Sequence, residues 1–459
     1  MATATATFDL LAPDVLADPY PHYARLRDAG PVHYLADVDL WVVTRYDDVQ
    51  AVLRDHERYS SDLRRLTKDL AANPFNPTMK VPRALRRFSG RLPWPRVLLT
   101  SDPPAHTVLR RKISKAFTPR MIGLWEPRVR GIAERLATEM VRAGETGSVD
   151  LVRDFAAPLP STVIAELMGI PSDRQDDFRT WSDNLVNALT AGGSVAKMVP
   201  SAIRIELFFA RVVRQRRKQP GDDLISLLMT GDKDTRLTFR ELVTFCILLL
   251  AAGNETTSNL VANAVLALFA HPDAQRLLEA DPSRAAALVE ETLRYDSPAQ
   301  GLLRVTTTDV AIGGTTVPPG SKVLPLVGSA NRDPDHWPDP DRFSLDRDPN
   351  DHLSFGTGIH FCIGNQLARL EARVALETLF RHYRGLQPAG APERITSPVL
   401  RGVRSLPVRL RQSGSASHGV GGWRPSGGVK VDGRRFLQEL PTQRRRTYTR
   451  DYCTSIAHR

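Results

Sequence analysis

Cysteine is scarce in this chain of 459 residues, which contains only Cys246, Cys362 and Cys453. Three scattered cysteines are too few for a disulfide framework, so we expect a reducing compartment in which a single cysteine can serve chemistry. The first residues lack the features of a secretory signal, because no Lys or Arg precedes Arg25 and no apolar stretch follows. The longest apolar run, residues 245–252, is far shorter than the roughly 20 residues that cross a bilayer. We therefore expect a cytoplasmic protein without a membrane segment.

The chain is basic, but little of its excess charge lies in the part that is expected to fold. The sequence has 62 Lys and Arg against 51 Asp and Glu. Residues 411–459 hold ten against three, which leaves 52 against 48 for residues 1–410. No basic patch with a recognisable nucleic-acid-binding motif occurs in that larger part, so we expect no nucleic-acid partner. We predict one folded domain at 1–410 and a disordered basic tail, rich in Gly, Ser and Arg, at 411–459.

The predicted secondary structure is mainly α-helical with small β-sheets. A composition of 42% hydrophobic and 25% charged residues is globular and excludes collagen-like, coiled-coil and wholly disordered chains. A β-hairpin is predicted at 32–43, a second β region at 310–327, and a long mobile loop at 62–95, where no period is sustained. Apolar residues recur at helical spacing in the segments 108–117, 129–143, 161–168, 241–270, 285–295 and 365–383.

The strongest chemical signal is the segment 355–364, which reads F-G-T-G-I-H-F-C-I-G and leads directly into a predicted helix. Its glycines allow backbone N–H groups to approach the Cys362 sulfur, and the helix N-terminus adds positive potential. Both effects lower the pKa of a thiol, which predicts a thiolate that acts as a metal ligand or a nucleophile. The flanking Phe355 and Phe361 favour a dry pocket, and a single thiolate in an apolar turn suits the axial ligation of haem iron. Cys246, in an apolar helical stripe, is expected to be a small buried hydrophobe.

A polar insertion, A-G-N-E-T-T at 252–257, interrupts the apolar pattern of the predicted helix 241–270. Gly costs about 1 kcal/mol in a helix interior, and a buried Glu must be hydrated or protonated. These costs favour a functional insertion. The alternative is a polar satellite on a kinked core helix.

Two further segments place side chains in pairs. E-T-L-R at 291–294 places an acid and a base on one helix face. Such a pair is usually exposed and contributes little to stability. Here, however, P-D-R-F follows at 340–343. D-P-P-A-H-T-V-L-R at 102–110 sets His106 and Arg110 four residues apart on a helix, where both can face one anion.

Together these motifs resemble those of the bacterial cytochrome P-450 monooxygenases. The segment 355–364 resembles the haem-binding signature of that family, 252–257 its oxygen-activation motif A-G-x-[D/E]-T-[T/S], and 102–110 its D-P-P-x-H-x-x-x-R segment. The resemblance covers roughly residues 8–410. It implies a helix-rich triangular prism that encloses haem b, the iron protoporphyrin IX group. The loop 83–96, rich in Arg, and the tail 411–459 depart from the family pattern.

The resemblance also implies a role for individual residues. Cys362 would be the iron ligand, and Thr256 with Glu255 would be the alcohol and acid that deliver protons to bound dioxygen. Glu291, Arg294 and Arg342 would form a buried structural triad. For Arg304 the alternative is a surface strand residue. The expected cofactor-binding residues besides Cys362 are His106, Arg110, Arg304, His360, Phe355, Gly356, Gly364 and Ala252, and the expected substrate contacts are Leu248, Ala252, Leu302 and Leu303.

The implied reaction is the insertion of one oxygen atom of O2 into an organic substrate, by hydroxylation or epoxidation. Small and aliphatic pocket residues favour a mostly apolar substrate. The Arg cluster at 83–96 suggests a carboxylate on that substrate, or is simply solvated. Because the sequence holds no flavin domain and no four-cysteine set, electrons must come from separate proteins, a ferredoxin and its NAD(P)H-dependent reductase. Arg111 and Lys112 are candidates for their docking face, or are simply solvated charges. We expect a monomer.

Two other classes compete with this interpretation. A peroxide-driven peroxygenase would use the same haem thiolate without protein partners, but it needs no acid and alcohol pair. A non-enzymatic haem sensor or carrier would have no reason to carry a proton-delivery motif. The pair Glu255 and Thr256 therefore favours a monooxygenase.

Overall fold

The computed structural model describes residues 8–410 apart from 63–96, 145–147, most of 172–194 and the positions 233, 349 and 384. The expectations for the loop 62–95 and its Arg-rich part lie almost wholly outside the described residues, as does the expectation for the tail. The division into a domain at 1–410 and a tail stays a prediction.

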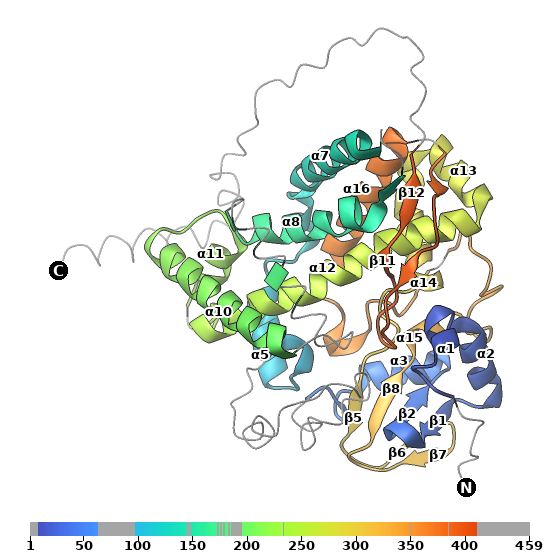
Figure 1. The fold of residues 1–459 in the computed structure, drawn as a ribbon. Helices are drawn as coiled ribbons and strands as arrows, with labels where there is room; N and C mark the ends of the chain where they lie inside the picture. The colour runs from blue at the N-terminus through green and yellow to red at the C-terminus, as the bar shows by residue number, and fades with distance from the viewer. Residues whose placement is uncertain are drawn as a thin grey trace.

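Helices make up most of the described structure (Figure 1). All six predicted helices begin within three residues of an observed start, and the predicted helix 285–295 coincides with an observed one. The helices are α1 (Pro13–Ala17), α2 (Tyr20–Ala29), α3 (Tyr46–Arg54), α5 (Ala105–Ser114), α6 (Pro119–Gly123), α7 (Glu126–Gly144), α8 (Pro158–Leu167), α10 (Val195–Lys218), α11 (Leu224–Met229), α12 (Phe239–Ala270), α13 (Pro272–Ala280), α14 (Ala285–Tyr295), α15 (Val327–Ala330) and α16 (Asn365–His382). Shorter helical turns are η1 (Ala36–Val38), η4 (Leu98–Thr100), η5 (Val152–Ala156), η7 (Pro282–Arg284) and η8 (Gly358–His360).

Helix α12 forms the long axis of the molecule. It begins two residues before the predicted start because Thr238 and Glu241 form a capping box: the Thr238 hydroxyl accepts from the Glu241 N–H, and the Glu241 carboxylate accepts from the Thr238 N–H. Its apolar residues are buried on several sides, so that α8, α14 and α16 pack around it. Figure 1 shows α12 crossing the whole helical half of the protein.

The main sheet and the β6-β7 pair form the other part of the protein, next to α1, α2 and α3, whereas β11 and β12 lie among the helices (Figure 1). The main sheet has the order β1-β2-β8-β5-β3, with β2 and β8 parallel and the other pairs antiparallel. The predicted hairpin at 32–43 is present, with Leu35 opposite Leu40, and Asp39 closes it at a positive φ of 48°. The strands are β1 (Val32–Leu35), β2 (Leu40–Val43), β3 (Tyr59–Ser60), β4 (Ser148–Asp150), β5 (Arg304–Thr306), β6 (Val310–Ile312), β7 (Thr315–Val317), β8 (Lys322–Pro325), β9 (Gln387–Pro388), β10 (Glu393–Arg394), β11 (Val403–Ser405) and β12 (Pro407–Arg409).

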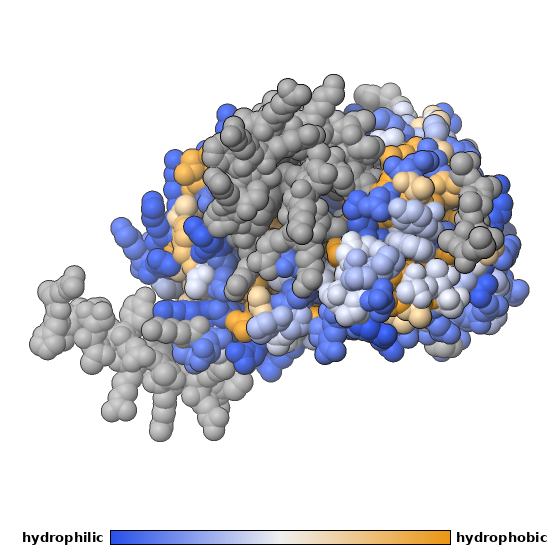
Figure 2. All heavy atoms as spheres, turned by 90° about the horizontal axis from the view of Figure 1, so that it is seen from below, coloured by the Kyte–Doolittle hydropathy of each residue, from blue (hydrophilic) through white to orange (hydrophobic). Residues whose placement is uncertain are grey.

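The surface is largely polar where the described residues form it. The face in Figure 2 is mostly hydrophilic, with hydrophobic residues gathered in small groups between charged ones. No helix among the described residues combines the length and the apolarity that spanning a membrane requires.

The acid and base of E-T-L-R form a buried ion pair on α14. Arg294 donates from Nη2 to Glu291 Oε1 over 2.8 Å and from Nε to Oε2 over 2.9 Å. Neither side chain is more than 1% exposed. Arg294 also donates to the carbonyl oxygens of Asn331, Pro340 and Arg342, so it ties α14 to the distant segment that includes P-D-R-F.

The third member of the expected triad is different from the one predicted. The Arg342 side chain is exposed, and only its carbonyl oxygen faces Arg294. The turn explains this orientation: Asp339 has a φ of 48°, and the Arg342 N–H donates to the Asp339 carbonyl over 3.0 Å. Arg347 takes the expected place, because its Nε donates to Glu291 over 3.3 Å. Its guanidinium also donates to the carbonyls of Pro338, Asp339 and Arg342.

This correction is testable by comparing two alanine variants. Arg347→Ala should lower the free energy of unfolding in urea by about 2–3 kcal/mol, because it removes hydrogen bonds to a buried carboxylate and to three carbonyls. Arg342→Ala should change it by less than about 0.5 kcal/mol, since the carbonyl remains. Equal losses in the two variants would mean that the Arg342 side chain belongs to the triad after all.

Candidate functional site

The Cys362 turn is held by backbone contacts that require glycine. Gly356 and Gly358 both have a φ of 68°, a conformation that residues with a Cβ rarely adopt. A Cβ at Gly358 would lie 3.0 Å from the Arg54 Cα, so α3 approaches the turn as closely as the backbone permits. The Cys362 N–H donates to the Phe355 carbonyl over 2.9 Å, which closes the turn just before α16 begins.

The electrostatic setting of the thiol differs from the predicted one. Burial raises the pKa of Cys362, and this effect outweighs the Gly364 N–H, Arg110 and Arg369, all of which lower it. The prediction of a lowered pKa was wrong for the protein alone, because it counted the favourable dipoles and omitted the desolvation of the thiolate. A metal cation at the sulfur would supply the missing stabilisation, since metal binding releases the thiol proton.

Buried basic side chains converge beside this turn. The His106 ring, on α5, is 1% exposed, and its centroid lies 4.3 Å from that of His360. Arg304, at the start of β5, is 5% exposed. Neither ring nitrogen of His106, nor Nε2 of His360, has a hydrogen-bond partner within the described part of the chain. Such unmet polar atoms are costly in a protein interior and indicate a site for an anionic ligand.

Burial also explains how these groups titrate. Desolvation lowers the pKa of His106 to about 4, with a further contribution from the charge of Arg110. Desolvation and Arg304 lower the pKa of His360 to about 3. The pKa of Arg304 itself falls to about 10, and among the described residues the carboxylate that opposes this shift is Asp102. Asp102 is already engaged, since it accepts hydrogen bonds from Ser60 and from the Ser61 N–H. Both imidazoles are therefore neutral at pH 7, and the positive potential of the cluster comes from Arg304 and Arg110.

Arg110, the fourth expected donor, lies on the same side of α5 as His106. Its Nη2 donates to the Phe361 carbonyl over 2.6 Å, and the residue is half-buried. This contact joins α5 to the Cys362 turn. Lys112, which was a candidate for a docking face, is instead 6% exposed and pairs with Glu241 at 3.2 Å. Arg111 is exposed, so only this residue of the two remains available to a partner.

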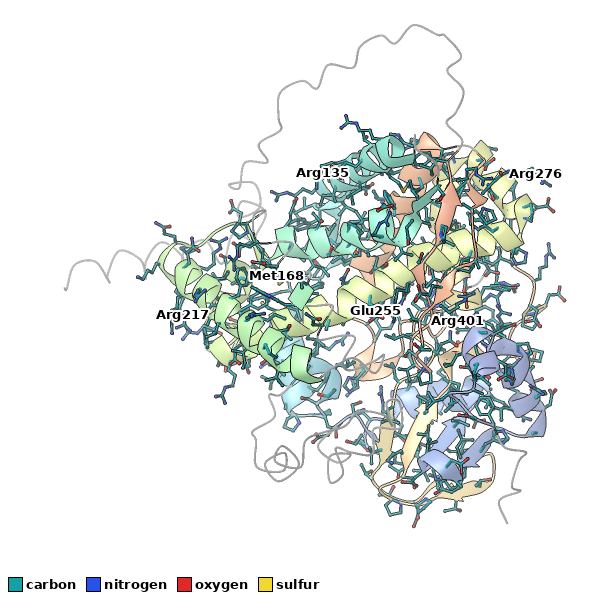
Figure 3. All side chains as sticks on the ribbon, in the orientation of Figure 1. Arg135, Met168, Arg217, Glu255, Arg276 and Arg401 are labelled. Atoms are coloured by element: carbon teal, nitrogen blue, oxygen red, sulfur yellow. The ribbon has the colours of Figure 1, made fainter. Side chains whose placement is uncertain are left out.

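The polar insertion of α12 lies midway along the helix, where Figure 3 shows Glu255 near the centre of the molecule. Thr256 Oγ1 donates to the Ala252 carbonyl over 2.7 Å, so the hydroxyl is held against the helix one turn back. Ala252 is exposed although its helix is otherwise deeply buried, and Glu255 is half-buried. Gly253 has a packing reason, since a Cβ there would lie 2.8 Å from Ile164 Cδ1 on α8.

Space is left beside the remaining expected residues. A Cβ at Gly364 would meet nothing within 4 Å, and one at Gly356 would meet only Leu302, at 3.9 Å. Leu248, Leu302 and Leu303 are half-buried. A small pocket lies beside Leu248, whereas a second pocket, between Leu10 and Arg401, has none of the predicted site residues in its lining.

These residues fit a flat, doubly anionic group that carries a metal. The thiol of Cys362 offers one metal ligand, the basic cluster matches two carboxylates, and the open space at Gly364 admits a ring over the turn. The set therefore fits a haem-thiolate site in its donor chemistry.

Comparisons with known proteins agree with this class. The Cytochrome P450 family profile matches residues 88–409. The chain is 39% identical to the cytochrome P450 monooxygenase PikC of Streptomyces venezuelae, over 90% of this chain and 95% of that one. It is also 39% identical to the vitamin D(3) 25-hydroxylase of Pseudonocardia autotrophica, over 89% and 98%. The structure of CYP109Q5 from Chondromyces apiculatus has a TM-score of 0.77 at 38% identity, and the match covers 88% of this chain and 98% of that one.

The chain belongs to the cytochrome P450 family, and it is a haem-dependent monooxygenase of that family. The family and the helix-rich fold expected from the motifs are confirmed. Sequence reasoning missed several residues around the Cys362 turn, namely Glu290, Arg347, His352, Asn365 and Arg369. A local signal existed only for Asn365 and Arg369, which are four residues apart on one helix.

The His106 environment predicts a pH dependence in the cofactor-free protein. Above pH 6.5 the ring is neutral in both the folded and the unfolded chain, so it does not affect stability there. As the pH falls from 6.5 towards 4, the unfolded chain takes up the proton first and the folded state loses stability. His106→Gln should flatten the fall of the urea midpoint over this range relative to wild type. Parallel curves for the two proteins would contradict the assignment.

Proposed function

We propose that this monooxygenase binds haem b and inserts one oxygen atom of O2 into a mostly apolar organic substrate, by hydroxylation or epoxidation. The observation that carries the proposal is the buried cluster of Arg304, His106 and His360 next to the Cys362 turn. Its unmatched positive potential suits the two propionates of haem b, and the single thiol suits the fifth ligand position of the iron.

The chain's own residues bind and orient the cofactor. Cys362 is the proposed thiolate ligand, held by its N–H bond to the Phe355 carbonyl. Arg304, His106, His360 and Arg110 are the proposed propionate donors. The proposed ring contacts are Phe355, Gly356, Gly364 and Ala252. Thiolate-ligated haem, when bound, supplies the activation of O2 and favours cleavage of the O–O bond.

Thr256 and Glu255 are the proposed proton-delivery pair. Cleavage of the O–O bond with release of water consumes protons. A hydroxyl must therefore be held in place to pass these protons on, and an acid must supply them to the hydroxyl. The bond from Thr256 Oγ1 to the Ala252 carbonyl fixes the hydroxyl on the exposed part of α12. Glu255 precedes it on the same turn and is half-buried.

A mostly apolar substrate is supported by the side chains that surround Ala252. Leu248 lies one turn earlier on α12, and Leu302 and Leu303 precede β5. All three are aliphatic and half-buried, so a ligand that covers them gains apolar burial. A relative named for the hydroxylation of vitamin D(3), itself largely hydrocarbon, supports the same substrate class.

Electron supply by a ferredoxin and an NAD(P)H-dependent ferredoxin reductase completes the proposal. Phe361, next to Cys362, is 38% exposed, and Arg111 is exposed on α5, the helix whose Arg110 donates to the Phe361 carbonyl; this combination suits an acidic partner. We further propose that the enzyme acts as a monomer in the cytoplasm.

Carbon monoxide binding tests the ligand assignment. The reduced wild-type protein exposed to carbon monoxide should show the strongly red-shifted Soret band of a thiolate-ligated haem. Cys362→His should move the band to the position typical of histidine ligation, because the imidazole replaces a strong electron donor with a weaker one. Cys246→Ala is the control and should keep the wild-type band. A wild-type band at the histidine position would contradict the proposal.

Thr256→Ala tests the proton-delivery role. The variant should consume NAD(P)H and O2 with reconstituted partners but form severalfold less product, because reduced oxygen leaves as peroxide when protons are misdelivered. The measured quantity is product per NAD(P)H. Ser258→Ala is a matched control, since residue 258 lies about 200° around the helix from residue 256. Unchanged coupling in Thr256→Ala would exclude the role.

A further inference from the structure

An acid on α14 contacts the helix that follows the Cys362 turn. Glu290 accepts two hydrogen bonds from Arg369 of α16, from Nε to Oε1 over 2.6 Å and from Nη2 to Oε2 over 3.0 Å. The bidentate geometry fixes the plane of the guanidinium. Both side chains are 30% exposed, so the pair is partly shielded from water.

His352 completes the environment of this carboxylate with a further hydrogen bond. Its Nδ1 accepts from the Ser354 N–H over 3.3 Å, so the neutral ring carries its proton on Nε2. Nε2 then donates to Glu290 Oε2 over 3.2 Å. Although burial alone would raise it, the hydrogen bonds from His352 and Arg369 lower the pKa of Glu290 to about 2. Glu290 is therefore an anion at neutral pH.

Arg369 reaches the Cys362 turn from two directions. Its Nη1 donates to Asn365 Oδ1 over 2.9 Å, and Asn365 Nδ2 donates to the Cys362 carbonyl over 2.7 Å. Its Cζ also lies 4.4 Å from the centroid of the Phe355 ring, and the Phe355 carbonyl accepts the Cys362 N–H. The Cys362 carbonyl thus bonds to Asn365 and the Cys362 N–H to Phe355, and Arg369 contacts both of these residues.

The charge of Arg369 acts on the sulfur as well. It reaches the cysteine through Asn365 and the Cys362 carbonyl, and Arg110 donates to the neighbouring Phe361 carbonyl. Arg110 has no comparable carboxylate partner among the described residues, whereas Arg369 is paired with Glu290. The positive potential at the sulfur therefore depends on how far Glu290 offsets Arg369.

We propose that Glu290 is a positioning residue for the Cys362 turn. Its carboxylate holds Arg369 against Asn365 and Phe355 and offsets the positive charge of Arg369 near the sulfur. This inference rests on the proposed role of Cys362 as the iron ligand. Loss of the carboxylate charge leaves Arg369 uncompensated, so that the thiolate donates less electron density and the ferrous state of the iron gains stability.

The test is the reduction potential of the haem-loaded protein, measured by spectroelectrochemistry. Glu290→Gln should shift the ferric to ferrous equilibrium towards ferrous by up to about tenfold, which is about 59 mV for one electron. It should retain the red-shifted carbon monoxide band of wild type. Glu377→Gln is the matched control, since Glu377 also pairs with arginines, Arg130 and Arg373, but lies roughly 18 Å farther along α16 than Asn365. It should leave the potential unchanged.

Removal of the partner charge provides the second arm. Arg369→Gln should shift the potential in the opposite direction, and the double variant E290Q/R369Q should return towards wild type, because the two charges cancel in the native pair. Glu290→Asp keeps the charge and shortens the side chain, so it should lie near wild type in potential. This variant also serves if Glu290→Gln fails to hold the cofactor.

The possible results separate this inference from the proposed function. An unchanged potential in Glu290→Gln with the red-shifted band intact would overturn the inference alone. Equal shifts in Glu290→Gln and Glu377→Gln, or a displaced potential in Glu290→Asp, would overturn it too, because a general loss of ion pairs or of packing would then explain the effect. A wild-type protein without the red-shifted band would overturn both proposals.

Discussion

The buried ion pair between Glu291 and Arg294 is the interaction on which the geometry of the site depends. Arg294 donates to the Asn331 carbonyl, and the Asn331 side chain accepts from the Leu353 N–H and donates to Ser354. Residues 353 and 354 lead directly into the Cys362 turn. A single guanidinium thus joins α14 to the segment that carries the cysteine. Such a pair adds little net stability over apolar packing, and its value here is that it specifies one arrangement of the chain.

Helix α14 acts on the site through two adjacent acids that face different partners. Neighbouring residues on a helix point about 100° apart, so Glu291 can face Arg294 while Glu290 faces α16. The first acid sets the path of the chain before the turn, and the second contacts the helix after it. Rotation or displacement of α14 would therefore disturb the Cys362 turn from both ends, which gives this short helix more influence than its length suggests.

The sequence was informative where the relevant residues are contiguous. The Cys362 turn and the helical segments are encoded in local spacing, and the structure has them at or near the expected positions. Contacts between distant residues escaped prediction. Arg347 takes the place expected for Arg342 because a turn at Asp339 orients the two side chains differently. The raised pKa of Cys362 depends on burial, a sum over many distant neighbours that no motif encodes.

Charge is distributed unequally around the site, and this asymmetry indicates what the protein lacks by itself. On one side the cations have acids: Arg369 has Glu290, and Lys112 has Glu241. On the other side the Arg304 cation is buried with only the already engaged Asp102 to oppose it in the described chain, and ring nitrogens of His106 and His360 have no hydrogen-bond partner there. Burying such a cluster costs folding free energy, and a ligand that carries two carboxylates recovers it. Binding of such a ligand and folding are therefore coupled, because the buried cluster finds matching negative charge only when the ligand is bound.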